Sequence, residues 1–89
     1  MSVKRSEILA TADALVNGDR AKDYGDATES FTRLGQMWGA ILGHDVSAAQ
    51  VAMCLAALKL SRLSQTPNHA DSWIDLAGYA ALGAEVSGA

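Results

Sequence analysis

The sequence predicts an all-α protein: a compact four-helix bundle that forms a single domain over residues 1–89, with an ordered core at about residues 6–86. Four segments carry apolar residues three or four positions apart, which is the spacing of one helix face. Helix-capping residues stand at nearly every boundary between these segments. No segment shows the alternating pattern and the enrichment in β-branched residues that are typical of a strand. These observations favour helices packed on helices.

The first two predicted helices precede and follow a polar segment. The first covers about residues 6–16, and Gly18 is placed to end it. The second begins after Asp26, which stands three residues before Glu29, as an N-cap residue precedes an acidic residue at N3. Gly43 is placed to end the second helix. The apolar stripes are Ile8, Leu9, Ala12, Leu15 and Val16 in the first helix, and Phe31, Leu34, Met37, Trp38, Ile41 and Leu42 in the second.

The third predicted helix begins at Ser47, which has the capping-box spacing to Gln50, and continues to about Ser64. Pro67 bars its continuation. It is apolar on nearly all sides, so it needs neighbours on more than one side, which a domain of this size provides only in part. We therefore expect a homo-oligomer, a dimer or higher, with the third or fourth helix at its interface.

The fourth predicted helix starts at Asn68 and carries Asp71 at its third helical position. Its apolar stripe consists of Trp73, Leu76, Ala77, Ala80, Ala81 and Ala84. Asp71, Asp75 and Tyr79 fall in one row, because residues four positions apart share a helix face. Asp75 lies in the middle of the helix, where aspartate has poor propensity and no cap to form, so it most needs an explanation.

Composition and charge exclude several classes of function. The chain is 49% hydrophobic and 19% charged, as folded globular proteins are. Its net charge of -3 argues against duplex nucleic acid as a partner, because binding to phosphates needs a basic surface. No segment reads as a signal peptide or is long and apolar enough to cross a bilayer, so we expect a cytoplasmic protein with no membrane partner. Cys54, the single cysteine, is predicted to be a small core side chain.

Two cations interrupt the apolar third helix, and two carboxylates lie on the fourth. Lys59 and Arg62 are predicted to meet Asp71 and Asp75 across a contact between these helices, because an isolated buried charge is costly. The contact would be either a structural ion-pair network or a site for a metal or phosphate. The alternatives are that Lys59 extends to solvent and that Arg62 serves the helix C-terminus.

The polar segment at residues 17–25 gathers further groups that could bind a ligand. Arg20 and Lys22 are cations, Tyr24 is an aromatic residue with a hydroxyl, and the helix N-terminus that follows favours phosphate. This combination suits the polyphosphate of a nucleotide; the alternative is a solvated charged loop. Trp38 and Trp73 are expected to anchor the core, although an exposed edge of one could stack on a base. His44 and His69 are expected at the surface, since they lack the spacing of a zinc site.

The carboxylates of the second and fourth helices allow two readings. Glu29 and Asp71 each have a structural role open to them as residues of a first helical turn. With Asp75 they would also supply the oxygen ligands that Mg²⁺ takes in proteins. The sequence alone leaves both readings open.

Several motifs carry a resemblance that covers nearly all of the chain. They are the Asp23-Tyr24-Gly25 segment, Lys59-Leu60-Ser61-Arg62, and Asp71-Ser72-Trp73-Ile74-Asp75-Leu76-Ala77-Gly78-Tyr79-Ala80. In these motifs the chain resembles a family of small phage and prophage proteins. More distantly it resembles the MazG-like all-α nucleoside-triphosphate pyrophosphohydrolases, helical oligomers that hold Mg²⁺ with carboxylates of two facing helices. Their Glu-Glu-x-x-Glu and Glu-x-x-Asp motifs are absent here, since the second helix offers only Glu29.

Three hypotheses follow. The first is a phage-type helical protein that binds a nucleotide or a nucleotide second messenger, can sequester it without turnover, and needs no metal. Its ligand-binding residues would be Arg20, Lys22, Tyr24, Lys59, Arg62 and Tyr79. The second is a Mg²⁺-dependent, MazG-like pyrophosphohydrolase with Glu29, Asp71 and Asp75 as metal ligands. The third is a helical interaction module in which the charged pairs only fix packing.

Overall fold

The computed structural model describes residues 2–18 and 26–89. These residues form four helices and no strand: α1 (Arg5–Asn17), α3 (Ala27–Leu42), α4 (Ala48–Gln65) and α5 (Ala70–Val86). The predicted all-α class is therefore confirmed for the described part of the chain. None of the helices described is long and apolar enough to span a membrane.

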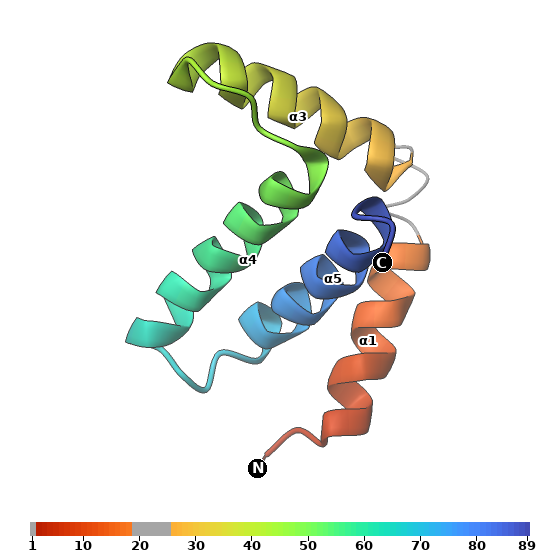
Figure 1. Ribbon diagram of the computed structural model, residues 1–89. Coiled ribbons are helices and arrows are strands. Elements are labelled where there is room, and N and C mark those ends of the chain that lie inside the picture. Colours follow the sequence, from red (N-terminus) through yellow and green to blue (C-terminus); the bar gives the residue numbers. More distant parts are fainter. Residues whose placement is uncertain (1, 19–25) are drawn as a thin grey trace.

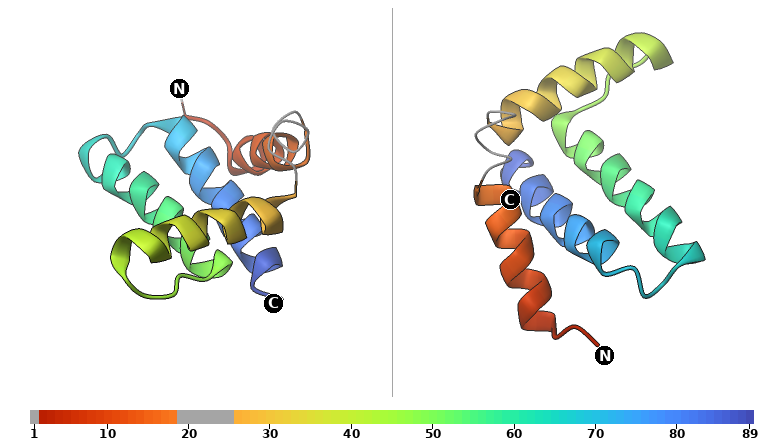
Figure 2. Two further views of the ribbon diagram at one scale, coloured as in Figure 1. Left: turned by 90° about the horizontal axis from the view of Figure 1, so that it is seen from above. Right: turned by 180° about the vertical axis from the view of Figure 1, so that it is seen from behind.

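α5 lies between α1 and α4 and packs along both of them (Figure 1). α4 and α5 run antiparallel, joined by the turn at residues 66–69, whereas α3 crosses the start of α4 and touches α5 only slightly. The two further views show the outer half of α3 extending beyond the other helices (Figure 2). The radius of gyration is 13.8 Å, somewhat above the roughly 12 Å expected for a compact domain of this length. The four helices therefore form a compact arrangement, as predicted, from which the outer half of α3 projects.

Capping residues begin and end the helices largely as predicted. Asp26 caps α3 by accepting a hydrogen bond from the Thr28 amide, while Glu29 stays exposed. Ser47 and Gln50 form both hydrogen bonds of the capping box that begins α4. Gly43 ends α3 with a φ of +80°, a conformation that favours glycine. These local signals fix the helix boundaries to within a residue or two of the predicted ones.

The start of α5 differs from the prediction. His69, not Asn68, is the N-cap residue: its Nδ1 accepts a hydrogen bond from the Ser72 amide at 3.3 Å. The Ser72 hydroxyl lies 2.7 Å from the same Nδ1, and Ser72 is buried. His69 is therefore a partly buried structural residue and not the surface histidine expected from sequence.

The core lies where α3, α4 and α5 meet. Its buried centre is Phe31, Val51 and Ala52. Partly buried residues surround that centre: Leu34, Trp38, Val46, Ala48, Leu55, Tyr79, Leu82 and Val86. Gly35 lets the chain entering α4 fold back against α3, because a Cβ there would collide with the Val46 carbonyl oxygen.

Two residues predicted to be in the core are exposed instead. Cys54 lies on the outer side of α4, because the contacts with α3 and α5 use the opposite side of that helix. Trp73 remains 44% exposed, and its Nε1 donates to the Pro67 carbonyl oxygen at 2.8 Å. This hydrogen bond links Trp73 to the turn before α5, whereas Trp38 packs against the core as expected.

Candidate functional site

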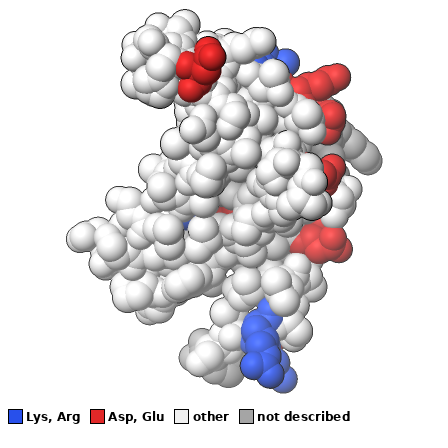
Figure 3. Space-filling view, in the orientation of Figure 1, with Lys and Arg blue, Asp and Glu red and all other residues white. Residues whose placement is uncertain are grey.

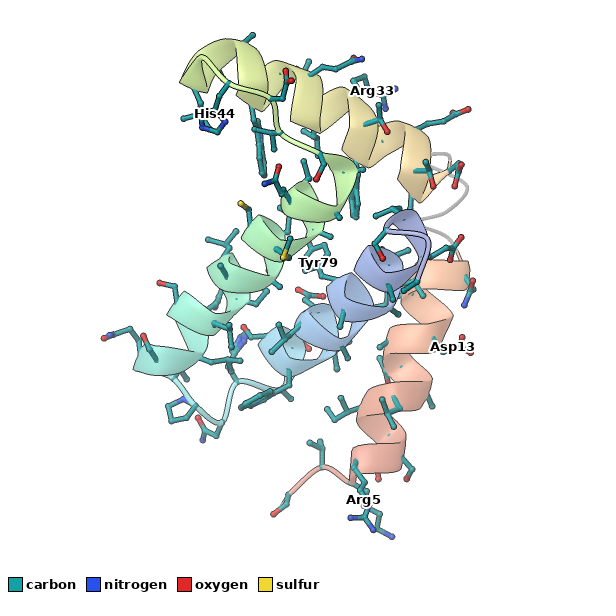
Figure 4. The ribbon with its side chains drawn as sticks, in the orientation of Figure 1. Arg5, Asp13, Arg33, His44 and Tyr79 are labelled. Atoms are coloured by element: carbon teal, nitrogen blue, oxygen red, sulfur yellow. The ribbon has the colours of Figure 1, made fainter. Side chains whose placement is uncertain are left out.

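The row Asp71, Asp75 and Tyr79 runs along α5 from solvent into the core. Asp71 is exposed in the first turn, and Asp75 and Tyr79 are partly buried. Figure 4 shows Tyr79 between α5 and α4. The three residues share a face because they are four positions apart. Only Asp75 and Tyr79 of the three are enclosed, because α4 packs against that part of α5.

Asp75 meets Lys59 across the contact between α4 and α5. The Lys59 Nζ lies 3.1 Å from Asp75 Oδ2, and the two side chains are 20% and 18% exposed. This ion pair confirms the predicted contact between the cationic helix and the acidic helix. The second predicted pair is not formed in the described part of the chain, where Arg62 and Asp71 are both exposed.

A cavity of about 610 Å³ lies between the end of α1, the start of α3 and the middle of α5. Asp75 and Tyr79 both line it, and Leu55 of α4 contributes to its wall. The other lining residues are Ala12, Leu15, Val16, Asn17, Asp26, Ala27, Ser30, Phe31, Leu34, Ile74, Gly78, Leu82 and Glu85. This volume falls within the range of roughly 300–1,000 Å³ that is usual for small-molecule sites.

The cavity has largely apolar walls, and the charged groups that line it in the described part of the chain are carboxylates. Phe31, Leu34 and Tyr79 give it aromatic and aliphatic surface, while Asp26, Asp75 and Glu85 bring carboxylates. No Lys or Arg among the described residues lines it. Such a lining suits an uncharged ring with hydrogen-bond donors better than a bare phosphate, which the carboxylates would repel.

The three carboxylates proposed as Mg²⁺ ligands do not come together. Glu29 is exposed near the start of α3, and Asp71 is exposed at the start of α5, near the opposite end of α5 from α3 (Figure 1). In residues 2–18 and 26–89, no group of three or more His, Cys, Asp or Glu residues could hold a metal ion. The described donors therefore do not fit the metal cluster of the MazG-like enzymes.

Arg20, Lys22 and Tyr24, the predicted ligand residues before α3, lie outside the described residues. The neighbouring positions Asn17 and Asp26 both line the cavity. In the sequence, the predicted ligand segment therefore lies between two residues that line the cavity.

Sequence reasoning missed several lining residues. Ser30 on α3 and Glu85 on α5 line the cavity without belonging to any motif. A helical signal for Ser30 exists, since Ala27, Ser30 and Leu34 share one face of α3. Asn17 lines the cavity because α1 ends beside α5. Its side-chain amide donates to Asp13 Oδ1 at 2.8 Å.

The domain of unknown function DUF6378 matches residues 7–87, which is most of the chain. The chain belongs to the DUF6378 family. The matched residues include α3, α4 and α5 in full and all of α1 except its first two residues.

Two curated relatives come from mycobacteriophages. The Gene 55 protein of Mycobacterium phage L5 is 41% identical over 76 residues, covering 84% of this chain and 49% of the relative. The Gene 55 protein of Mycobacterium phage D29 is 36% identical over 73 residues, covering 82% and 48%. The DUF6378 chain thus spans about half the length of these relatives. They confirm the predicted similarity to phage proteins, and no solved structure matches the chain significantly.

Proposed function

We propose that this domain binds a nucleotide or a nucleotide-derived signal in the cavity between α1, α3 and α5, and that it holds the ligand without turning it over. The observation that carries the proposal is the cavity itself, about 610 Å³ in volume and lined by Asp75 and Tyr79 of the motif in α5. A cavity with apolar walls and a few convergent polar groups is the usual form of a small-molecule site.

The chemistry of the lining assigns the base and sugar to this cavity. Phe31 and Tyr79 offer aromatic surface to a base. The carboxylates of Asp26, Asp75 and Glu85 can accept hydrogen bonds from the amino groups of a base or from sugar hydroxyls. This assignment departs from the first hypothesis, in which Lys59 faces phosphate, because Lys59 does not line the cavity and pairs with Asp75 across the contact between α4 and α5.

The phosphate end of the ligand needs a cation from elsewhere. By sequence, Arg20 and Lys22 are the candidates, because they lie in the sequence between Asn17 and Asp26, which both line the cavity. Arg62 is exposed and Arg33 projects from the outer side of α3 (Figure 4), so neither is proposed for this role. We therefore expect Arg20→Ala and Lys22→Ala to weaken the binding of a nucleotide more than the binding of the corresponding nucleoside.

The test is calorimetric titration with a panel of nucleosides, nucleoside triphosphates, cyclic nucleotides and ADP-ribose, each with and without Mg²⁺. Ser30→Trp should abolish binding, because Ser30 lines the cavity and the larger side chain would fill it. Thr32→Trp is the matched control, because Thr32 is exposed on the same helix and does not line the cavity. Tyr79→Phe should leave the fold unchanged and weaken the binding only of those ligands that form a hydrogen bond with the Tyr79 hydroxyl.

Product analysis in the same samples separates binding from catalysis. Binding that is abolished by Ser30→Trp, without release of pyrophosphate, supports the proposal. Release of pyrophosphate that depends on Mg²⁺ and is lost in Asp75→Asn would replace it with the pyrophosphohydrolase reading. An absence of binding across the panel, in a folded sample, would sink the proposal.

A further inference from the structure

α1 stands outside the hydrophobic core. The residues of the core cluster come from α3, from α5 and from α4 with the chain just before it. Among the described helices α1 packs against α5 only, on the side of α5 that faces away from α4 (Figure 1). α3, α4 and α5 contact one another. Separation of α1 from α5 would therefore leave the contacts among the other three helices in place.

The seam between α1 and α5 is only partly filled. Ala12 is the one residue of α1 that is buried, and Leu9 is 63% exposed. A second cavity, about 210 Å³ in volume, lies along the seam and is lined by residues of these two helices only. Atoms that border a void lose the dispersion contacts that would otherwise hold the two helices together. The attachment of α1 to α5 is therefore weak for a contact between two helices.

Charge along the seam weakens this attachment further. Asp13 of α1 and Glu85 of α5 both line the 210 Å³ cavity, and no Lys or Arg among the described residues does so. Figure 3 shows acidic side chains gathered over the end of α1 and the start of α3. The last turn of α1 has no basic residue, although a cation there would offset the partial negative charge of the helix C-terminus. Carboxylates on both sides of the seam therefore favour separation of the two helices.

α1 also lacks the local stabilisation that the other described helices have. Its N-cap residue, Lys4, makes no side-chain capping hydrogen bond, whereas side chains cap the starts of α3, α4 and α5. α1 is 13 residues long, and isolated helices shorter than about 12–15 residues are marginal in water. α1 therefore depends on α5 to remain helical, and it should unfold when it detaches.

The same helix forms one wall of the larger cavity, to which it contributes Ala12, Leu15, Val16 and Asn17. We infer that α1 is a movable wall: it detaches from α5 while α3, α4 and α5 stay folded, and this opening admits the ligand. The detachment needs no ligand, whereas its role in ligand entry rests on the proposed function. A ligand that contacts both Leu15 and Phe31 would hold α1 in place, because binding to the closed form alone stabilises that form.

Hydrogen exchange of the whole chain, read by mass spectrometry, tests the detachment without a ligand. We expect protection of the α1 amides to be about 100-fold or more below that in the middle of α4, because local opening costs less than global unfolding. Ala12→Glu should abolish protection in α1 and leave that of α4 and α5 nearly unchanged, since it places a charge in the buried contact of α1. Ala14→Glu is the matched control: Ala14 is exposed on the same helix, so α1 should exchange as in the wild type.

Three results of this experiment would overturn the inference. They are unfolding of the whole chain by Ala12→Glu, equal protection of α1 and α4 in the wild type, and equal protection of α1 in Ala12→Glu and Ala14→Glu. Each would show that α1 does not open separately from the other helices.

A reversible cross-link tests whether the opening admits the ligand. A Cβ on residue 78 would lie 3.1 Å from Val16 Cγ1, close enough for a disulfide between cysteines at positions 16 and 78. Val16→Cys with Gly78→Cys is made together with Cys54→Ser, which removes the exposed native thiol. Stopped-flow mixing with ATP, GTP and ADP-ribose should show association at least about 10-fold slower in the oxidised protein than after reduction, because the locked wall cannot open. The reduced protein is the control, since its sequence is identical.

Association and release should slow together, because a lock on the entrance changes rates and leaves the equilibrium affinity nearly the same. Equal association rates in the two forms, or a lower affinity with an unchanged rate of association, would overturn ligand entry past α1. If neither form binds a nucleotide, the proposed function fails, and the hydrogen exchange of α1 decides the detachment by itself.

Discussion

The ammonium of Lys59 lies 3.1 Å from the carboxylate of Asp75, and about four-fifths of each side chain is withdrawn from solvent. This pair ties α4 to α5 one helical turn away from Tyr79, in the wall of the cavity. Each charge costs solvation energy on burial, which the partner offsets. The pair therefore links the stability of the helix hairpin to the shape of the candidate site.

A double-mutant cycle measures this link. Lys59→Met and Asp75→Leu should each lower the free energy of unfolding by about 1–3 kcal/mol, because each leaves a partly buried charge behind. The double variant should be more stable than the sum of the two effects, with a coupling of about 1–2 kcal/mol in urea titrations. Arg62→Met, at an exposed position in the last turn of α4, is the control and should change stability by less than about 0.5 kcal/mol. A coupling near zero would mean that the pair is only a surface contact.

The start of α5 offers a direct comparison between neighbouring residues. His69→Ala should cost about 1 kcal/mol, because it removes the acceptor for the Ser72 amide and leaves the buried Ser72 hydroxyl without its ring partner. Asn68→Ala should be nearly neutral, because Asn68 is exposed and does not cap the helix. Thermal unfolding followed by circular dichroism distinguishes the two. If Asn68→Ala proved the more damaging change, the sequence-based assignment of the cap would stand.

Gly35 should tolerate no side chain. Gly35→Ala places a Cβ against the Val46 carbonyl oxygen, a backbone atom that can move only by shifting the chain that enters α4. We expect a loss of about 2 kcal/mol or more, within the range seen for overpacked interiors. Gln36→Ala, at the next and exposed position of α3, should be neutral or slightly stabilising. Equal stability of the two variants in urea would show that the turn relaxes freely.

The capping box at the start of α4 should be worth about 1 kcal/mol. Ser47→Ala removes the acceptor for the Gln50 amide, which lies 3.1 Å from the Ser47 hydroxyl. Ser61→Ala replaces an exposed serine within the same helix and should cause no loss, since alanine is the better helix former. Urea midpoints of the two variants test the difference; a destabilised Ser61→Ala would point to an unrecognised role for that hydroxyl.

Local chemistry made much of the fold predictable from the sequence. Helix periodicity and caps such as Asp26, Ser47 and Gly43 act within a few residues, so the helices and most of their ends could be read directly. The pairing of Lys59 with Asp75 could also be predicted, because buried charges require partners.

The cap at His69 could not be predicted with the same ease. Asn68 and His69 both stand where a cap is needed, and asparagine is the commoner cap residue. In the structure His69 is the cap, Trp73 donates to the Pro67 carbonyl oxygen, and Ser72 is buried against the His69 ring. These contacts depend on how the turn packs, which residue preferences alone do not determine.

The sequence by itself determined the helices, their apolar faces and the need of Lys59 for an acidic partner, because these follow from interactions within a few residues and from the cost of burying charge. Only the tertiary structure decided that Asp75 is enclosed while Asp71 is exposed, and that Glu29 does not join them in a metal-binding group among the described residues. It also decided that Cys54 and Ile41 face outward. The physical reason is that helix periodicity defines a face, whereas the angle at which α3 and α4 cross determines which part of that face is covered.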